Sequence, residues 1–189
     1  MSYVILCVLW ILYFILHSLL ASIRVKSFFK KFMKNEYRFY RIIYSVISTT
    51  GLLFLSVFNA SISPVIIFVS GGLVRYLSLM IATFGVIIIS RAFREYKFSS
   101  FIGVEKEENE FKQTGILKHV RHPIYSGTVL IVLGFFLFNP TSATLVSVCC
   151  IIAYLPIGIY FEEKKLINQF GHEYLTYKQK TPSVFPKIR

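Results

Sequence analysis

Two polar clusters in the second half of the chain hold residue types that could do chemistry. The first, residues 115–127, reads GILKHVRHPIYSG, and the second, residues 160–177, reads YFEEKKLINQFGHEYLTY. The first places an arginine and a histidine before Pro123, which suits the opening turn of a helix because its missing N–H is not needed there. The second supplies two adjacent carboxylates after an apolar stretch.

Each cluster also has a structural interpretation. Arg121 and His122 could anchor the chain at the membrane–water boundary, where basic and aromatic side chains gather. Glu162 and Glu163 could mark a solvated helix end beside two lysines. Adjacent carboxylates at such a boundary are costly unless water solvates them or cations pair with them. Whether the two clusters lie close together therefore decides between the structural and the functional interpretation.

The stretch between the clusters brings them to one face. Residues 124–138 form an apolar run of 15 residues that stops at Asn139-Pro140, and residues 142–161 form another of 20. A hydrocarbon core of about 30 Å needs roughly 20 apolar helical residues, so we predict a hairpin with a short or tilted first arm. Both of its ends lie on one side of the membrane.

Three further apolar segments precede the hairpin, at about Ser2 to Ala21, Tyr40 to Ala60 and Leu73 to Ala92. The sequence is 55% hydrophobic with a mean hydropathy of +0.63, above the needs of a soluble domain of this size. We expect the short piece Val65 to Ser70 to lie at the interface or to begin a tilted helix.

These segments predict an all-α membrane protein with about five transmembrane helices, the last two forming a hairpin, and a cytoplasmic C-terminal helix that begins at Glu162. One membrane domain would cover residues 1–189. Its parts are three spans in 1–92, a cytoplasmic loop in 93–123, the hairpin in 124–161 and the C-terminal segment in 162–189.

The net charge of +12 could suggest nucleic acid, but the distribution of the charges argues against it. Of the 21 lysines and arginines, 20 fall in the blocks 24–41, 91–121 and 164–189, and Arg75 stands apart. An excess of basic residues marks cytoplasmic segments, which predicts an N-terminus outside and a C-terminus in the cytoplasm. Arg75 would then snorkel at the outer surface.

The cysteines indicate neither a metal nor a redox site. Cys7, Cys149 and Cys150 lie within apolar runs without CxxC spacing, so we expect them to pack in the core. The sequence shows no pattern for a metal site and no GxGxxG after a strand-like run.

The order of motifs resembles the isoprenylcysteine carboxyl methyltransferase family and its relatives that methylate phospholipids or small thiols. The resemblance covers about Glu110 to Pro186 through G-x-x-x-x-x-R-H-P-x-Y-x-G, an apolar hairpin, E-E-x-x-L-x-x-x-F-G-x-E-Y-x-x-Y and a proline-containing tail. HSLLAS from His17 and the YRxxY-like stretch from Tyr37 are similar to bacterial members, so we expect a bacterial cytoplasmic membrane.

The resemblance implies a membrane methyltransferase that uses S-adenosylmethionine as its cofactor, with the lipid bilayer around it and no nucleic-acid partner. Glu162 and Arg121 would be the catalytic residues. The cofactor contacts that the resemblance implies are Asn109, Glu110, Phe111, Lys112, Leu117, His122, Pro123, Ile124, Tyr125 and Glu162. Leu117 departs from the usual tyrosine, which removes an aromatic wall.

The residue types suit that cofactor on physical grounds as well. A sulfonium and an ammonium call for a carboxylate such as Glu162 and an aromatic face such as Tyr125, and a carboxylate calls for a cation such as Arg121. Methyl transfer is an in-line displacement, in which positioning and the exclusion of water can supply most of the rate.

The acceptor is expected to differ from the family's namesake. The resemblance implies an arginine four residues before the first glutamate of the pair as a clamp for the prenylcysteine carboxylate, but Gly158 stands there. A buried carboxylate without a cation loses several kcal/mol in desolvation, so an acid needs Arg91, Arg94 or His17 as a substitute. We expect a hydrophobic or small thiol, a lipid amine or, less favourably, a prenylcysteine-like acceptor.

Other classes of function stay open at this point. The chain could be a non-catalytic membrane scaffold or assembly factor on the same fold, or a relative of sterol reductases that uses NADPH. His17, with Ser18 in the first span, could be an interhelical hydrogen-bonding residue or a catalytic base. An aromatic and aliphatic lining for the acceptor is expected from Tyr13, Phe14, Tyr154 and Tyr160.

Overall fold

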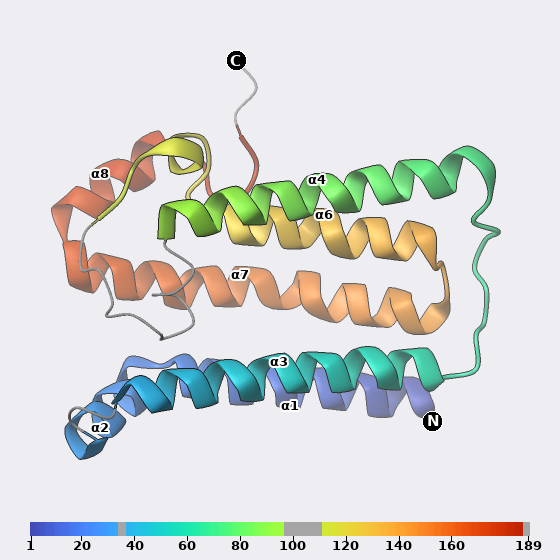
Figure 1. Ribbon diagram of the computed structural model, residues 1–189, viewed down its shortest axis with the longest axis horizontal. Coiled ribbons are helices and arrows are strands. Elements are labelled where there is room, and N and C mark those ends of the chain that lie inside the picture. The colour runs from blue at the N-terminus through green and yellow to red at the C-terminus, as the bar shows by residue number, and fades with distance from the viewer. Residues whose placement is uncertain (34–36, 97–110, 187–189) are drawn as a thin grey trace.

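The computed structural model describes residues 1–33, 37–96 and 111–186, where every regular element is a helix (Figure 1). The elements are α1 (Ser2–Ala21), α2 (Ile23–Met33), α3 (Tyr37–Ser61), α4 (Gly72–Tyr96), the 3-10 helix η2 (Gly115–Lys118), α6 (Pro123–Phe138), α7 (Ser142–Phe170) and α8 (His172–Lys180). The all-α prediction is confirmed. One boundary was wrong, because α7 continues past Phe161 to Phe170 and carries Glu162 on the hairpin helix itself.

Four helices, α1, α3, α4 and α7, are long and apolar enough to cross a membrane, and α6 is a shorter apolar helix of 16 residues. Large apolar side chains such as Val57 and Leu73 are 69% and 73% exposed, as expected for helices surrounded by lipid. These features support an integral multi-pass membrane protein. The fifth predicted segment exists but is shorter than the other four.

The helices form two groups that lie side by side in Figure 1, α1 with α3 and α4 with α6 and α7. The pair α4 and α6 approaches closely through glycines, since a Cβ on Gly127 would lie 2.6 Å from the Gly85 carbonyl oxygen. A Cβ on Gly134 would lie 2.7 Å from the Ser78 carbonyl oxygen. Small residues at a helix interface allow such backbone contact in a membrane, where lipid offers no hydrophobic driving force.

A buried set of polar side chains joins α1, α3 and α7, and we call it the Asn59 network. Its members are Trp10, Asn59, Thr141, Thr144 and Ser147. Trp10 Nε1 donates to Ser147 Oγ at 2.9 Å, and Ser147 Oγ donates to Asn59 Oδ1 at 2.9 Å. The two threonine hydroxyls lie 3.0 Å apart. These hydrogen bonds link the three helices to one another.

The bundle has two distinct ends (Figure 1). The N-terminus, the α3–α4 connection and the α6–α7 turn lie at one end, whereas α2, η2 and α8 lie at the other. The predicted short piece at residues 65–70 is extended and not a helix start, because Ser142 N donates to the Val65 carbonyl and Ile67 N to the Pro140 carbonyl. Arg75 lies at the first end, 4.7 Å from the Phe138 ring centroid.

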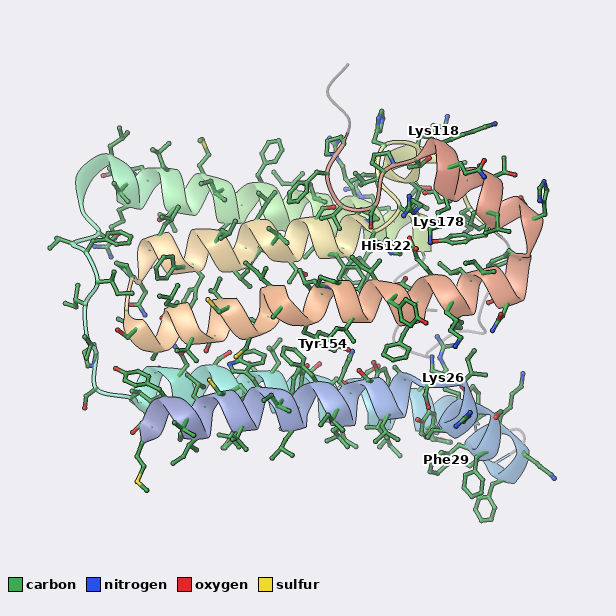
Figure 2. All side chains as sticks on the ribbon, turned by 180° about the vertical axis from the view of Figure 1, so that it is seen from behind. Lys26, Phe29, Lys118, His122, Tyr154 and Lys178 are labelled. Carbon is green, nitrogen blue, oxygen red and sulfur yellow. The ribbon has the colours of Figure 1, made fainter. Side chains whose placement is uncertain are left out.

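The basic helix α2 lies at the second end. The sequence had indicated only a block of charged residues there. Lys26 and Phe29 in Figure 2 belong to it, and the Phe29 ring stacks on Tyr40 with centroids 4.5 Å apart. Phe28 and Phe32 are 65% and 80% exposed. A helix with lysines and exposed phenylalanines is typical of one that lies in the membrane interface.

Candidate functional site

The two polar clusters meet at the second end of the bundle. Glu163 on α7 is buried and faces Arg121, which donates through Nε at 3.0 Å and Nη2 at 2.6 Å to the same carboxylate oxygen. Lys178 Nζ lies 2.6 Å from the other oxygen, and His122 Nε2 lies 3.2 Å from the first. We call Arg121, His122, Glu162, Glu163 and Lys178 the carboxylate site. Figure 2 shows His122 and Lys178 at this end.

The Arg121 side chain is fully engaged. Its Nη1 also donates to the carbonyl oxygens of Lys178 and Thr181, and its side chain is 9% exposed, like that of Glu163. A buried pair of this kind is stable only when further hydrogen bonds satisfy its remaining polar atoms, which these carbonyls do. Arg121 therefore ties the start of α6 to α7 and α8.

The C-terminal tail fixes the opening of α6 from the other side. Arg121 N donates to the Pro182 carbonyl at 2.9 Å, and Ser126 Oγ donates to the Val184 carbonyl at 2.6 Å. Pro123 stands at the first position of α6, as the sequence predicted, and His122 precedes it. The orphan N–H groups before the helix are thus satisfied by the tail, which gives the late prolines a structural role.

The loop before η2 is tied to α4. Thr114 Oγ1 donates to Glu95 Oε2 at 2.6 Å, and Lys112 Nζ donates to the Glu95 carbonyl at 3.2 Å. Gly115 has φ +51°, and a Cβ there would collide with the Glu95 carboxylate. Only glycine meets both conditions at little cost, which explains why this motif begins with one.

Aromatic side chains of α8 hold η2 and the preceding loop. The Tyr177 hydroxyl donates to the Leu117 carbonyl at 2.6 Å, and Phe111 contacts the rings of Tyr174 and Tyr177. Burial raises the pKa of Tyr177 to about 12 and raises the pKa of Tyr174 as well, because the phenolate would be poorly solvated there. The Tyr174 hydroxyl lies near Arg121 but makes no hydrogen bond of ordinary geometry among the described residues.

Glu162 differs from its neighbour, because its side chain is 42% exposed. It forms an ion pair with His122 Nδ1 at 3.6 Å and lies beside the Tyr125 hydroxyl. The His122 and Tyr125 rings meet edge to face with centroids 5.6 Å apart. His122 thus bridges the two carboxylates, with Nε2 toward Glu163 and Nδ1 toward Glu162. An open carboxylate beside an aromatic ring is a suitable place for a small cation.

The hydroxyl of Tyr125 reaches α7 at Gly158. A Cβ on Gly158 would lie 3.1 Å from this hydroxyl, so a larger side chain would compete with it for space. Gly158 is one helical turn before Glu162, and the two positions share a face of α7. The glycine therefore admits a neutral hydroxyl where the family resemblance implies an arginine.

The predicted site residues have different environments. His122, Pro123 and Leu117 are buried, and Ile124 and Tyr125 are partly buried at the start of α6. Phe111 and Lys112 lie beside α8 and α4. Asn109 and Glu110 lie outside the described residues. The catalytic role predicted for Arg121 stays a prediction, although its donors are used within the protein.

Sequence reasoning gave too little weight to Glu163. The sequence indicated Glu162 as a site residue and no role there for Glu163, whereas Glu163 is the buried centre of the ion pairs. Lys178 and the tail carbonyls at 182–184 were also missed. The only signal in the sequence is the pair EE itself, because partners such as Lys178 come from another helix.

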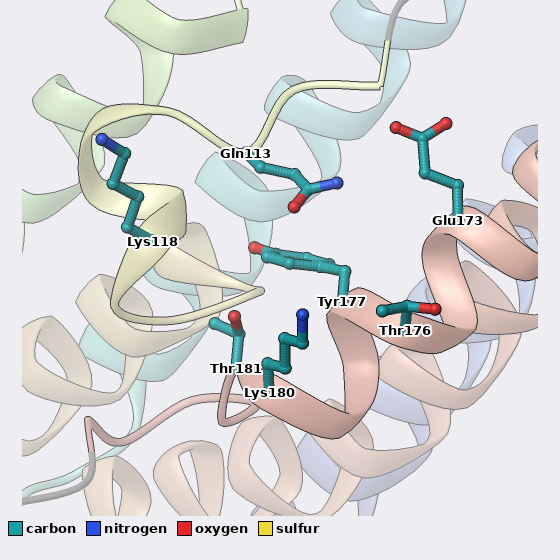
Figure 3. A pocket seen from close by; sticks show the side chains of 7 residues that line it. All are labelled: Gln113, Lys118, Glu173, Thr176, Tyr177, Lys180 and Thr181. Carbon is teal, nitrogen blue, oxygen red and sulfur yellow. The ribbon is translucent and has the colours of Figure 1, made fainter.

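A surface cavity of about 360 Å³ lies between α8 and the segment that contains η2 (Figure 3). Its lining is Gln113, Lys118, Glu173, Thr176, Tyr177, Lys180 and Thr181. Tyr177 and Thr181 connect the cavity to the Arg121 contacts, but Glu162 is not part of its wall. We therefore place the candidate site at Glu162 and not in this cavity.

Comparison with known proteins agrees with this arrangement of motifs. A family model described as NnrU protein matches residues 5–186, which is nearly the whole chain. The chain belongs to the NnrU protein family. No solved structure matches this NnrU-family chain.

Several curated proteins are similar to parts of this NnrU-family chain. Methanethiol S-methyltransferase 1 of Bradyrhizobium diazoefficiens is 36% identical over 45% of the chain, and that alignment covers 29% of the relative. Methanethiol S-methyltransferase of Crocosphaera subtropica is 29% identical over 72% of the chain and is itself covered to 48%.

Protein-S-isoprenylcysteine O-methyltransferase B of Arabidopsis thaliana is 34% identical over 48% of the chain, and that alignment covers 47% of the relative. The chain thus spans less than half the length of the curated relatives it matches. These similarities confirm the resemblance to membrane methyltransferases of the isoprenylcysteine type.

Proposed function

We propose that this protein is an S-adenosylmethionine-dependent membrane methyltransferase whose donor site includes Glu162, His122 and Tyr125. The observation that carries the proposal is the division between two adjacent carboxylates. Glu163 is buried and surrounded by three basic side chains, whereas Glu162 is 42% exposed and available to a further positive charge.

The residues present fit this cofactor. When bound, S-adenosylmethionine supplies a methyl group activated by a sulfonium. Glu162 would hold the positive charge, Tyr125 would present its hydroxyl beside it, and His122 would fix the Glu162 carboxylate in place. The buried Tyr174 hydroxyl offers a donor that the described residues do not use in a hydrogen bond. Phe111, Lys112, Leu117, Pro123 and Ile124 would complete the pocket.

An uncharged acceptor suits the site better than a carboxylate. The Tyr125 hydroxyl occupies the space beside Gly158, and Glu162 follows one turn later, so an acid would meet the negative charge of Glu162 with no arginine at position 158. Repulsion and desolvation of such an acid would together cost several kcal/mol. We expect a hydrophobic or small thiol, or a lipid amine, ahead of a prenylcysteine carboxylate.

The test is a side-by-side assay of purified protein with labelled S-adenosylmethionine. We expect methylation of alkanethiols, or of phosphatidylethanolamine, to exceed methyl-ester formation on farnesylcysteine. Faster esterification of farnesylcysteine would contradict the assignment of the acceptor. Turnover on none of these acceptors, together with no binding of the donor, would favour a scaffold. Binding of NADPH in its place would favour a reductase.

The orientation predicted from the basic residues belongs to the same proposal. The site would face the cytoplasm, with the N-terminus outside. Asn59 is buried, so exposed Ser63 is the better position for an introduced cysteine, with Lys180 as its counterpart at the other end. In intact cells that produce a variant without Cys7, Cys149 and Cys150, a membrane-impermeant thiol reagent should label only the cysteine introduced at Ser63. Labelling of the cysteine introduced at Lys180 in intact cells would reverse the orientation.

A further inference from the structure

A second polar cluster lies between α1, α3 and α7, and we call it the His17 cluster. Its members are His17, Ser18, Tyr44, Ser48 and Tyr154, all half-buried. His17 Nδ1 lies 3.2 Å from Ser48 Oγ, and the hydroxyls of Ser18 and Tyr154 are 2.7 Å apart. Figure 2 shows Tyr154 on the side of α7 that faces α1. These groups stand within apolar helices, where polar side chains are costly and commonly functional.

The contacts of His17 leave one ring nitrogen poorly satisfied. The Tyr44 hydroxyl is 3.3 Å from both Nδ1 and Nε2. The lone-pair directions of the two nitrogens diverge, so a hydroxyl equidistant from both is aligned with neither. Nδ1 has Ser48 as a second partner, whereas among the described residues Nε2 has only the Tyr44 hydroxyl, which it shares with Nδ1. When Nδ1 donates to Ser48, Nε2 keeps an open lone pair.

The His17 cluster is continuous with the candidate donor site. Tyr154, Gly158 and Glu162 follow one another at four-residue steps on one face of α7, about 12 Å from first to last. The Tyr125 hydroxyl reaches α7 beside Gly158, between the other two. A molecule held beside the Tyr125 hydroxyl would therefore have Glu162 on one side and the His17 cluster on the other.

We propose that the His17 cluster is the acceptor site, that it takes a small uncharged thiol, and that His17 is the base that removes the thiol proton. This inference rests on the proposed function. A thiol is a poor nucleophile until it becomes a thiolate, and a charged thiolate would not partition into this apolar surrounding by itself. A neutral imidazole at the acceptor resolves that conflict, because proton removal can accompany attack.

The proposed step is balanced. The S–H proton passes to His17 Nε2, and the sulfur electron pair forms the bond to the methyl carbon. The bond from that carbon to the sulfonium breaks, and its electron pair returns to the donor sulfur, which leaves as a neutral thioether. The imidazolium then releases its proton to water. Ser48 holds Nδ1 throughout and is a positioning residue.

The test compares two thiols in two variants. With an alkanethiol at neutral pH, His17→Gln should lower kcat about 10²-fold or more. With an aromatic thiol, which is already largely ionised, the same variant should keep most of its turnover. Ser48→Ala should show the same selectivity with a smaller loss of about tenfold. Asn59→Ala, a polar change on α3 away from this cluster, should affect both thiols equally.

A binding measurement provides a readout other than turnover. Trp10 is the single tryptophan and stacks on Phe14, which stacks on Tyr154 at 4.1 Å. Titrating propanethiol into protein saturated with S-adenosylhomocysteine should change Trp10 fluorescence in a saturable way, with weaker binding in His17→Gln. If wild type methylates alkanethiols and His17→Gln does so equally, this proposal is wrong and the proposed function stands. If wild type binds no S-adenosylmethionine, both are wrong.

Discussion

The Asn59 network and the carboxylate site both join α7 to its neighbours through buried polar groups, but they differ in what they leave open. In the Asn59 network, neutral donors and acceptors from three helices satisfy one another. In the carboxylate site, Glu163 is enclosed by cations while Glu162 on the same helix is 42% exposed. The Asn59 network stabilises the packing of the helices. The carboxylate site also stabilises the packing, and in addition it leaves the Glu162 carboxylate accessible to a ligand.

The difference predicts that stability and binding can be separated within two adjacent residues. Glu163 holds Arg121, Lys178 and, through them, the tail and α8. Glu162 contributes little to that framework and is held in place by His122. If substitutions at Glu162 and at Glu163 changed stability and donor binding to the same extent, the two residues would not have separate roles.

The largest expected effect is that of Glu163→Gln on stability. Removing one charge of a buried pair leaves Arg121 uncompensated, which costs about 3–5 kcal/mol. Thermal unfolding of the detergent-purified variant should therefore shift strongly downward. Glu162→Gln is the matched control, because an exposed pair is worth about 0–1 kcal/mol. Equal unfolding midpoints for the two variants would contradict the assigned roles.

Asn59→Ala should have a smaller effect on stability and none on the site. Interhelical hydrogen bonds in membranes average about 0.6 kcal/mol and reach about 1.7, so a loss of about 1 kcal/mol is expected. Donor affinity should match that of wild type, because the Asn59 network lies toward the opposite end of the bundle (Figure 1). A fall in donor affinity would show that the two regions are coupled.

Tyr177→Phe should have a similarly small effect, about 1 kcal/mol, through loss of the bond to the Leu117 carbonyl. The folded-state pKa of about 12 exceeds the ordinary value of 10.0, so the folded state favours the neutral phenol. The tyrosine's contribution is complete below about pH 10 and disappears as the pH rises through about 12. Unfolding midpoints of wild type and variant should therefore converge over that window. A constant gap would exclude the hydroxyl as the cause.

The sequence predicted the helical segments well because their apolar lengths are set by the membrane. Spans one and two and the hairpin begin within about three residues of their expected positions. A separate helix beginning at Glu162 was predicted, whereas these residues continue α7 to Phe170; the charges after Phe161 resemble the end of a span even when the helix continues into water. The length and hydropathy of an apolar run indicate where a helix leaves the lipid. They do not indicate where the backbone hydrogen bonding of that helix ends.

The site was predictable in its composition but not in its pairing. The two polar clusters were visible in the sequence, the family resemblance identified RHPxY and EE as motifs, and the hairpin does bring them together. The choice between Glu162 and Glu163 depends on Lys178 and on the tail carbonyls, which pack against α7 only in three dimensions. The sequence around Glu162 and Glu163 does not indicate which distant residues will pack against them.

The most direct test of the central claim is isothermal titration of the purified protein with S-adenosylmethionine. Wild type should bind, and Glu162→Gln should bind about one to two decades more weakly, since a charge-assisted contact is worth about 1.5–3 kcal/mol. Asn59→Ala should bind like wild type, and NADPH should give no saturable heat. Unchanged affinity in Glu162→Gln, or no binding by wild type, would contradict the account.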